Sequence, residues 1–463
     1  MTARFDIAIL GAGPAGMAAA ARATQLGASV VVLDEQPNPG GQIYRNVDQA
    51  SAAQHHILGA DYSHGRVLTQ GLRDSGAVHC AGATVWDVTR DGVVTYSLNG
   101  QPEQIRARHL ILATGATERP MPLPGWTLPG VMTAGAAQIL LKSGGLVARD
   151  PVLIGCGPLL YLLAAQMIAA GRKPRALIET QSRSDMWAAR GDLPGALRGW
   201  RYLAEGAGLL TRIRAARVPR FAAAQDIALE GQDVLSRVRF TSQGKTHMIE
   251  TDIALLHHGV VPNTQISRAL RLDHAYDPVQ RCFMPRVDAL CASSDPAISI
   301  AGDGAGIGGA KVAAISGEVA AFAAACRLGL ITPQARNAGV APLQRKRRHE
   351  LQARPFLDRA YPPAAQSLTP ADATIICRCE EVTAGDIRRF AQLGCKGPNQ
   401  AKAFGRAGMG PCQGRFCGLT VTEILARETG QGQQETGALR IRAPLKPVTL
   451  GELAAYDATS QDT

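Results

Sequence analysis

The sequence predicts an α/β protein in which two doubly wound, dinucleotide-binding domains precede a small cysteine-bearing domain. Two strand–glycine turn–helix units, at residues 5–26 and 152–170, predict the two parallel-sheet domains. Four of the ten cysteines form two closely spaced pairs, Cys377 with Cys379 and Cys412 with Cys417, beyond a stretch rich in proline and arginine. At 463 residues, of which 46% are hydrophobic and 19% charged, the chain is long enough to form two or three such domains.

The first unit has the order strand, helix, strand. Phe5–Leu10 is a short apolar run, and residues 14–26 form an alanine-rich helical stretch that ends at Gly27. Residues 29–33 begin with a serine and continue with four apolar residues, as expected of a strand buried on both faces of a parallel sheet.

A glycine fingerprint lies at the first strand-to-helix turn. Gly11 permits the tight turn, Gly13 lets the backbone approach a pyrophosphate, and Gly16 allows close helix–strand packing. Asp34 ends the second strand, where a carboxylate can bind ribose hydroxyls, and Glu35 is the neighbouring alternative. The expected nucleotide-binding residues of this unit are Gly11, Gly13, Pro14, Ala15, Gly16, Asp34 and Glu35.

Three further motifs follow predicted strands. They are Gly40-Gly41-Gln42, Ala113-Thr114-Gly115 and Gly302-Asp303. They resemble the GG, ATG and G-D motifs of the glutathione-reductase-like flavoprotein superfamily, a resemblance that implies FAD as the nucleotide. It also implies that Asp303 reaches the ribityl–phosphate part of the flavin, and it adds Gly41, Gln42, Thr114, Gly115, Gly302 and Asp303 to the cofactor-binding set.

The second unit carries an altered fingerprint. It runs from Gly155 to Leu160, so that a leucine stands where the third glycine is expected, and Glu179 ends the following strand. Nicotinamide binding, a vestigial fold and a site for another adenine nucleotide all stay open. No cysteine pair occurs in residues 120–260, which argues against disulfide-reductase chemistry.

No catalytic residue is predicted. The sequence shows no Ser/His/Asp set and no pair of carboxylates with the spacing of an acid and a base. His257-His258 is a tempting pair, but neighbouring residues on a strand face opposite sides. We interpret both histidines as structural.

The cysteine cluster has the spacing C-x-C-x32-C-x4-C. Four thiolates are the usual complement of a [2Fe–2S] cluster. Structural zinc sites instead pair their cysteines as C-x2–4-C, so zinc is the second reading and free thiols the third. Cys395 lies outside the pattern and is expected to be a packed thiol. The predicted cluster ligands are Cys377, Cys379, Cys412 and Cys417.

Longer stretches carry a family resemblance. CRCEEVTAGDIR at Cys377–Arg388 and GMGPCQGRFCG at Gly408–Gly418 look like the bacterioferritin-associated-ferredoxin-type [2Fe–2S] domain. With GGQIYR, Pro129–Lys142 and Gly155–Ala164, the chain resembles the α (A) subunit family of heteromeric amine dehydrogenases. That family includes the A subunit of opine oxidase, hydroxyproline and proline dehydrogenase α subunits, the B subunit of hydrogen cyanide synthase and the α subunit of heterotetrameric sarcosine oxidase.

The resemblance implies an electron-transfer subunit of an oxidoreductase acting on CH–NH groups of opines or of imino or amino acids. The amine is then oxidised in a β subunit resembling a D-amino-acid or glycine oxidase, and a small ferredoxin-like γ subunit is a further expected partner. Electrons pass through flavin and a [2Fe–2S] cluster. FMN is expected at the subunit interface, and ATP or NAD are alternatives to FAD. The alternative functions are a stand-alone NAD(P)H-dependent reductase and a subunit of hydrogen cyanide synthase.

Charge and hydropathy limit the partners. The net charge is +11, but no nucleic-acid-binding module surrounds the basic run Arg345–Arg348, so no nucleic acid is expected. Residues 151–171 carry no charge, yet a strand and a buried helix account for them, so no membrane span is expected. Without a signal-peptide pattern, a cytoplasmic location is expected.

The expected division of the chain follows from these motifs. The predicted parts are residues 1–120 with 255–331 for the FAD or adenine-nucleotide domain, 121–254 for an NAD(P)-binding-like domain, 332–370 for a linker, 371–430 for the [2Fe–2S] domain and 431–463 for a C-terminal tail.

Overall fold

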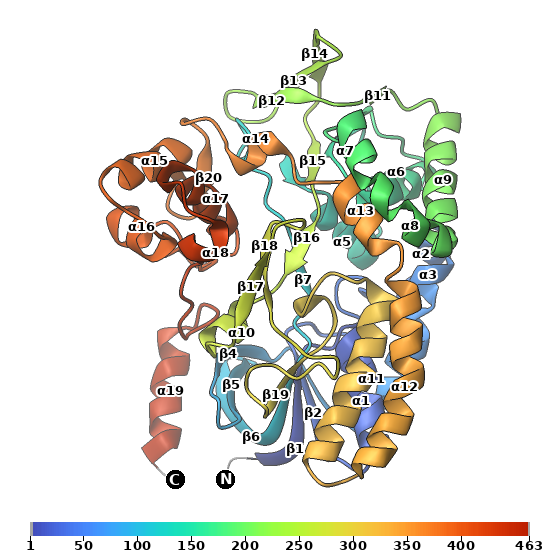
Figure 1. Cartoon of the computed structure of the whole chain (residues 1–463), viewed down its shortest axis with the longest axis vertical. Helices are drawn as coiled ribbons and strands as arrows, with labels where there is room; N and C mark the ends of the chain where they lie inside the picture. The colour runs from blue at the N-terminus through green and yellow to red at the C-terminus, as the bar shows by residue number, and fades with distance from the viewer. Residues whose placement is uncertain (1–2, 462–463) are drawn as a thin grey trace.

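The computed structural model describes residues 3–461 and has three parts, visible in Figure 1 as a lower sheet-and-helix body, an upper one and a smaller helical lobe beside them. Two of the chain segments that join the lower and upper bodies pair with each other. Within residues 3–461, no helix is both long and apolar enough to cross a membrane.

The lower body is built on a seven-stranded sheet. Its strand order is β3-β2-β1-β6-β5-β4, and β19 pairs with the carboxyl end of β6. Strands β1, β2, β3 and β19 run parallel to their neighbours, whereas β4 and β5 are antiparallel. The strands are β1 (Ala3–Leu10), β2 (Val30–Asp34), β3 (Val78–Ala81), β4 (Thr84–Val88), β5 (Val93–Leu98), β6 (Gln101–Leu112) and β19 (Ile298–Ile300).

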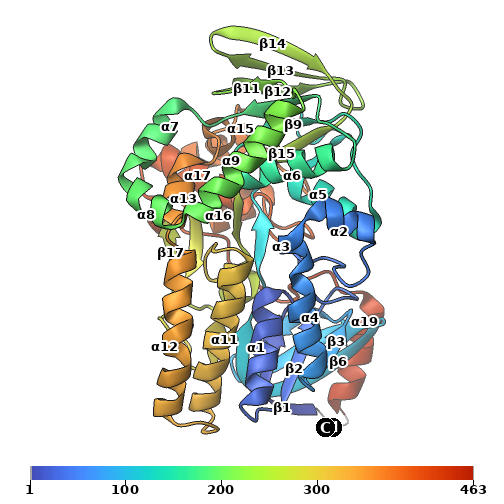
Figure 2. The same cartoon turned by 90° about the vertical axis from the view of Figure 1, so that its right-hand side faces the viewer.

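Helices cover one face of this sheet and stand side by side in Figure 2. A methyl group on Gly317 would lie 2.0 Å from the carbonyl oxygen of Ala15, so α1 and α11 can approach this closely only with glycine there. The helices of this body are α1 (Pro14–Gln25), α2 (Ala52–Leu58), α3 (Ala60–Ser63), α4 (Gly65–Asp74), α10 (Gln265–Ala269) and α11 (Ala310–Arg327), with the 3-10 turn η2 (Gly302–Gly304).

The upper body contains a five-stranded parallel sheet of order β11-β10-β9-β15-β8 and a three-stranded antiparallel sheet. The uncharged stretch at 151–171 forms strand β9 and the largely buried helix α6, as expected. The strands are β8 (Val131–Thr133), β9 (Val152–Gly155), β10 (Ala176–Glu179), β11 (Arg220–Phe221), β12 (Gln225–Glu230), β13 (Arg237–Ser242), β14 (Lys245–Glu250) and β15 (Ala254–His257). The helices are α5 (Ala134–Gly144), α6 (Pro158–Ala169), α7 (Arg183–Ala188), η1 (Ala189–Asp192), α8 (Leu193–Arg198) and α9 (Trp200–Ala215).

A two-stranded antiparallel ribbon connects the two bodies. It pairs β7 (Ala116–Glu118) with β16 (Val260–Pro262), so both chain crossings pass through one small sheet. Beside it lies the hairpin of β17 (His274–Asp277) and β18 (Cys282–Pro285).

The segment expected to be a linker is largely helical. The hydrophobic periodicity of this segment is weak, so its sequence predicts no helix. The structure instead contains the 18-residue helix α12, which is capped by Thr332 and includes Pro342. Three of the four residues of the basic run, Arg345, Lys346 and Arg348, are exposed on α12. The helices are α12 (Pro333–Glu350), α13 (Arg354–Ala360) and α14 (Ala365–Leu368).

The cysteine-bearing lobe has its own small core of buried side chains, which includes Ile387, Phe390, Val421 and Leu425. The C-terminal tail then returns to the lower body, where Leu445 N–H donates to the carbonyl oxygen of Trp86 at 2.7 Å. The elements are β20 (Ile375–Cys377), β21 (Val382–Thr383), α15 (Ala384–Gln392), α16 (Pro398–Gly405), α17 (Gly418–Thr429), α18 (Gln433–Thr436) and α19 (Leu450–Gln461).

Candidate functional site

The first glycine loop lies at the carboxyl end of β1, and its three glycines differ in the space around them. A methyl group on Gly11 would lie 2.5 Å from the oxygen of Ala113, and one on Gly16 would lie 1.8 Å from the oxygen of Gly11. A methyl group on Gly13 would meet only the Cα of Gly41, at 3.8 Å. Gly11 and Gly16 are therefore required by the protein's own packing, whereas Gly13 leaves room for a ligand.

The two acidic candidates at the end of β2 have different partners. Asp34 Oδ2 accepts a hydrogen bond from Ala12 N–H at 2.5 Å, and Oδ1 accepts one from Gln36 N–H at 2.7 Å. Burial raises the pKa of Asp34. Glu35 instead pairs with Lys446 of the tail, Nζ to Oε2 2.8 Å. Asp34 thus lies against the glycine loop, and Glu35 faces the tail.

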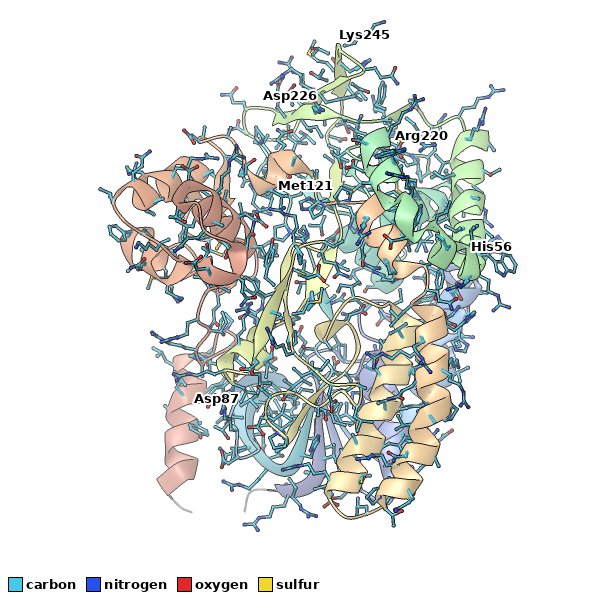
Figure 3. The ribbon with its side chains drawn as sticks, viewed as in Figure 1. His56, Asp87, Met121, Arg220, Asp226 and Lys245 are labelled. Carbon is cyan, nitrogen blue, oxygen red and sulfur yellow. The ribbon has the colours of Figure 1, made fainter. Side chains whose placement is uncertain are left out.

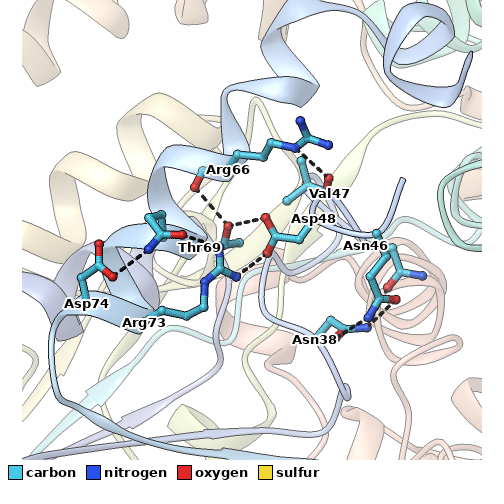
Figure 4. A network of polar contacts seen from close by, with 10 residues as sticks. Asn38, Asn46, Val47, Asp48, Arg66, Thr69, Arg73 and Asp74 are labelled. Atoms are coloured by element: carbon cyan, nitrogen blue, oxygen red, sulfur yellow. Dashed lines mark hydrogen bonds and ion pairs between the residues drawn. The ribbon is translucent and has the colours of Figure 1, made fainter. Parts of the chain in front are cut away.

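The Gly40-Gly41-Gln42 loop closes over the first loop. A methyl group on Gly41, whose φ is +61°, would lie 2.9 Å from the Cα of Gly13. The segment that follows is braced on α4, because Asp48 accepts hydrogen bonds from Thr69 Oγ1 at 2.8 Å and from Arg73 Nη1 at 2.7 Å (Figure 4). This network holds the loop against the fingerprint.

The remaining predicted residues meet at the same end of the sheet. Thr114 Oγ1 donates to the carbonyl oxygen of Asn263 at 3.0 Å, which ties the loop after β6 to the ribbon strand β16. Asp303 Oδ1 accepts from the N–H groups of Gly308 and Gly309, at 2.9 and 3.0 Å, just before α11 begins. Gly115 and Gly302 have positive φ angles, of +64° and +75°, which their turns require.

Two basic side chains at this site were not predicted. Arg45 is 8% exposed, and its Nε has no hydrogen-bond partner among the described residues. Lys142 is 3% exposed and donates to the carbonyl oxygen of Gln42 and to Gln138 Oε1, both at 3.0 Å. Arg45 ends the GGQIYR motif, and Lys142 ends the motif at Pro129–Lys142. Nothing in the sequence, however, indicates that Lys142 of α5 lies behind a loop 100 residues earlier.

The four clustered cysteines lie together as two pairs. The Cys417 thiol hydrogen-bonds to Cys377, and this bond, with N–H donors around Cys377, lowers the pKa of Cys377 to about 6. The thiols of Cys379 and Cys412 form the second pair, and the Cys412 N–H also points to Cys379. Cys395 is buried and donates to the Gly397 oxygen at 3.4 Å, outside both pairs. Among residues 3–461, no group of three or more His, Cys, Asp or Glu side chains has the geometry to hold a single metal ion.

A buried carboxylate attaches the cysteine lobe to the lower body. Glu423 on α17 is 4% exposed and accepts hydrogen bonds from Tyr276 Oη at 2.5 Å and Gln433 Nε2 at 3.0 Å. Arg281, at the tip of the β17–β18 hairpin, pairs with the same carboxylate through Nε and Nη2. Because α17 starts directly after Cys417, this contact also fixes the cysteine loop.

A small cavity of about 70 Å³ lies where the cysteine loop faces the ribbon. Its walls include Val261, Pro262 and Asn263 on one side and Gln413, Gly414 and Arg415 on the other. The cavity thus separates the loop between Cys412 and Cys417 from the ribbon, and none of the four clustered cysteines or of the predicted cofactor-binding residues lines it.

Comparisons with known proteins agree with this architecture. The family model "Pyridine nucleotide-disulphide oxidoreductase" matches residues 5–186, and "Sarcosine oxidase A3 domain" matches residues 372–457. The structure of L-proline dehydrogenase from P. horikoshii superposes with a TM-score of 0.71 at 17% identity, over 98% of this chain and 80% of that one. The α/β fold with two dinucleotide-binding domains, typical of flavoproteins, is confirmed.

Relatives of similar length are also found. The chain is 43% identical to the A subunit of opine oxidase from Rhizobium meliloti, over 99% of this chain and 88% of that protein. It is 33% identical to the HcnB subunit of hydrogen cyanide synthase from Pseudomonas aeruginosa, over 95% and 96% of the two chains. The alpha subunit of sarcosine oxidase from Rhizobium meliloti is 26% identical over 97% of this chain, which covers 42% of that longer protein.

Because there is free space beside Gly13, a substitution there can separate loss of nucleotide binding from loss of stability. Gly13→Ala should leave the fold intact, because its methyl group meets no protein atom closer than 3.8 Å, yet nucleotide binding should weaken by about tenfold or more. Gly16→Ala is the matched control and should cost about 1–3 kcal/mol or more of stability through overpacking. Nucleotide content of the purified chain and its thermal unfolding distinguish the two. Full nucleotide content in Gly13→Ala would refute this site.

Lys142 predicts a pH dependence of stability. Burial, with the charge of Arg45 nearby, lowers its pKa from 10.5 to about 7. Between those values the unfolded chain binds one proton more, so stability should rise with pH, by up to about 1.4 kcal/mol per unit. Below pH 7 both states are protonated and the contribution is flat. Lys142→Met should lose this rise in unfolding temperatures measured from pH 6.5 to 9.5, whereas exposed Lys173→Met should keep it; a rise retained in Lys142→Met contradicts the assignment.

Proposed function

The chain belongs to the family of the opine oxidase A subunits, and from that premise we propose that it is the electron-transfer subunit of a heteromeric opine or imino/amino-acid dehydrogenase. It is an oxidoreductase, and the donor class is a CH–NH group. The observation that carries the proposal is the pairing of the four cysteines beside the ribbon of a flavoprotein-type fold. A chain with both parts could accept electrons at one of them, the flavoprotein-type fold or the cysteine cluster, and pass them on through the other.

We propose a flavin, as FAD, at the first glycine loop, with ATP or NAD as alternatives for the same place. When bound, the flavin supplies the capacity to take up and release electrons singly or in pairs. The chain's own residues would bind and orient it: the open backbone at Gly13 would leave room for the pyrophosphate, and Asp34 would be the carboxylate for the ribose. Arg45, buried with an Nε that no described residue binds, is suited to an anionic part of the nucleotide.

We propose that Cys377, Cys379, Cys412 and Cys417 hold a [2Fe–2S] cluster. Two pairs of thiols fit this cluster better than one tetrahedral ion, because each iron takes two protein sulfurs. Backbone N–H groups of Cys379, Glu380 and Gly408 point at Cys377, and such donors stabilise thiolate charge. The cluster supplies one-electron transfer when bound.

We propose that the amine itself is oxidised elsewhere. Beside the first loop the described residues include one amine whose pKa is lowered to about 7, that of Lys142, but it is buried and donates to Gln42 and Gln138. We therefore place the substrate pocket in a β subunit resembling a D-amino-acid or glycine oxidase. FMN at the interface and a small ferredoxin-like γ subunit complete the proposed assembly. All ten cysteines are free thiols, which is consistent with the proposed cytoplasmic location.

The proposed division into parts keeps the predicted boundaries. The strands of the seven-stranded sheet all fall within residues 1–120 and 255–331, which supports that domain. The five-stranded sheet supports 121–254, although β15 continues to His257. We propose 332–370 as the linker, 371–430 as the [2Fe–2S] domain and 431–463 as the tail.

A second candidate function is a subunit of hydrogen cyanide synthase, which the match to HcnB over nearly the whole chain favours. The higher identity to the A subunit of opine oxidase places it second. Activity of the complete complex on opines against glycine separates the two.

The cluster proposal predicts an all-or-none dependence on four cysteines. Replacement of Cys377, Cys379, Cys412 or Cys417 by Ser removes one thiolate ligand, so each variant should lose the [2Fe–2S] absorbance and the EPR signal of the reduced protein. Cys395→Ser is the matched control, since its thiol lies outside both pairs. An intact signal in any of the four variants, or equal loss in Cys395→Ser, would overturn the ligand set.

The subunit proposal predicts that the isolated, cofactor-loaded chain reduces no artificial dye with opines, proline, hydroxyproline, sarcosine or glycine. Addition of the β subunit should restore dye reduction. In that complex, the cysteine variants should still allow substrate to bleach the flavin of the β subunit, while dye reduction falls by about tenfold or more because the transfer step follows. Turnover of any of these amines by the isolated chain would show that the electron-relay function is wrong.

A further inference from the structure

The second glycine loop lies at the carboxyl end of β9, where a second dinucleotide would be expected. We infer that this crevice is occupied by the chain's own residues, the linker segment 361–364 and Arg220, so that no nicotinamide dinucleotide binds there. The occupancy itself is independent of the proposed function. One consequence of the occupancy does rest on the proposed function: electrons would enter this chain from a partner flavoprotein and not from NAD(P)H.

The carboxylate that would hold the ribose is already fully engaged. Glu179 is 1% exposed, and its Oε1 accepts from Tyr161 Oη at 2.6 Å and from Gln181 Nε2 at 2.9 Å. Arg220 binds both oxygens, with Nε to Oε2 at 3.0 Å and Nη2 to Oε1 at 2.8 Å. Figure 3 labels Arg220 in the upper body. A ribose could reach Glu179 only by displacing this bidentate pair, in which the carboxylate is buried and the guanidinium is partly exposed.

The linker then contacts the loop itself. Cys156, the residue between the first two glycines of the fingerprint, donates its thiol hydrogen to the carbonyl oxygen of Pro362 at 3.2 Å. The ring of Tyr361 lies edge-on to that of Tyr161, in the first turns of α6, with centroids 6.2 Å apart. The linker therefore contacts both the glycine loop and the start of the helix that would border a bound dinucleotide.

A buried histidine fixes the next linker residues. His258 is 2% exposed, and its Nδ1 accepts a hydrogen bond from Ala364 N–H at 3.2 Å. Its Nε2 donates to the carbonyl oxygen of Pro120 at 2.8 Å, so the neutral ring joins the linker to the inter-body connection. Burial lowers its pKa to about 3, so the ring stays neutral at physiological pH. Leu160 is fully buried where the fingerprint has its third glycine.

The first arm of the test uses Cys156 as a native reporter in the full, cofactor-loaded chain. Its thiol is 1% exposed beneath the linker, so alkylation by iodoacetamide, followed by mass spectrometry, should be slow. Tyr361→Ala should raise the rate about tenfold or more by loosening the segment, whereas Ala365→Ser, an exposed position on the same linker, should not. An unchanged rate in Tyr361→Ala would overturn the inference.

The second arm measures nucleotide binding by calorimetry in the Gly13→Ala chain, in which binding at the first loop is weakened, and Glu179→Gln in that chain identifies any binding at the second loop. Neither NADH nor NADPH should bind at concentrations up to about 1 mM. About 1 mM NADH should also leave the Cys156 alkylation rate of the unmodified chain within about twofold of its value without nucleotide. Two results would overturn the inference. One is saturable NADH or NADPH binding that Glu179→Gln weakens tenfold, and the other is a large change in the Cys156 alkylation rate when NADH is added. Neither arm measures amine oxidation, so failure here is distinguishable from failure of the proposed function.

Discussion

The structure depends on one buried carboxylate, that of Glu423. The proposed electron relay would require the cysteine loop to stand at a fixed place beside the flavin-type fold, and the lobe's own core cannot ensure this. Four donor groups from Tyr276, Arg281 and Gln433 converge on the carboxylate. Removing one member of such a buried set typically costs about 3–5 kcal/mol, because the others lose their partner without regaining water. The directional bonds therefore define one orientation of the lobe, where apolar contact alone would allow several.

The local part of this architecture could be predicted from sequence because its signals are local. The glycine loops are short-range patterns with a steric cause, and the strand and helix that flank Gly11–Gly16 were placed within about two residues of their bounds. The spacing of the four cysteines likewise predicted that they gather. The choice between Asp34 and Glu35 could not be made, since it depends on Lys446, 411 residues further along the chain.

The residues that sequence reasoning missed share one property: their role exists only between distant segments. In the sequence, Lys142 is an ordinary helix position and Arg45 an ordinary loop position. Their place at the site is evident only from the contact between α5 and the Gly41 loop. The helical linker was missed because α12 carries few apolar residues and a proline, so its periodicity is faint. Leu160 and Glu179 mark the second loop as altered in the sequence, but the contacts of Arg220 and Pro362 that support the proposed occupancy come from distant segments.

The linker on the second loop also has a mechanical consequence. Two bodies joined by a two-stranded ribbon would ordinarily swing about it, since small inter-domain contacts permit such motion. Here a third strand of covalent chain crosses from α12 into the upper body and is pinned at Cys156 and His258. These contacts hold the upper body in one position relative to the lower body. Rotation of the upper body about the ribbon therefore requires the linker contacts at Cys156 and His258 to break first.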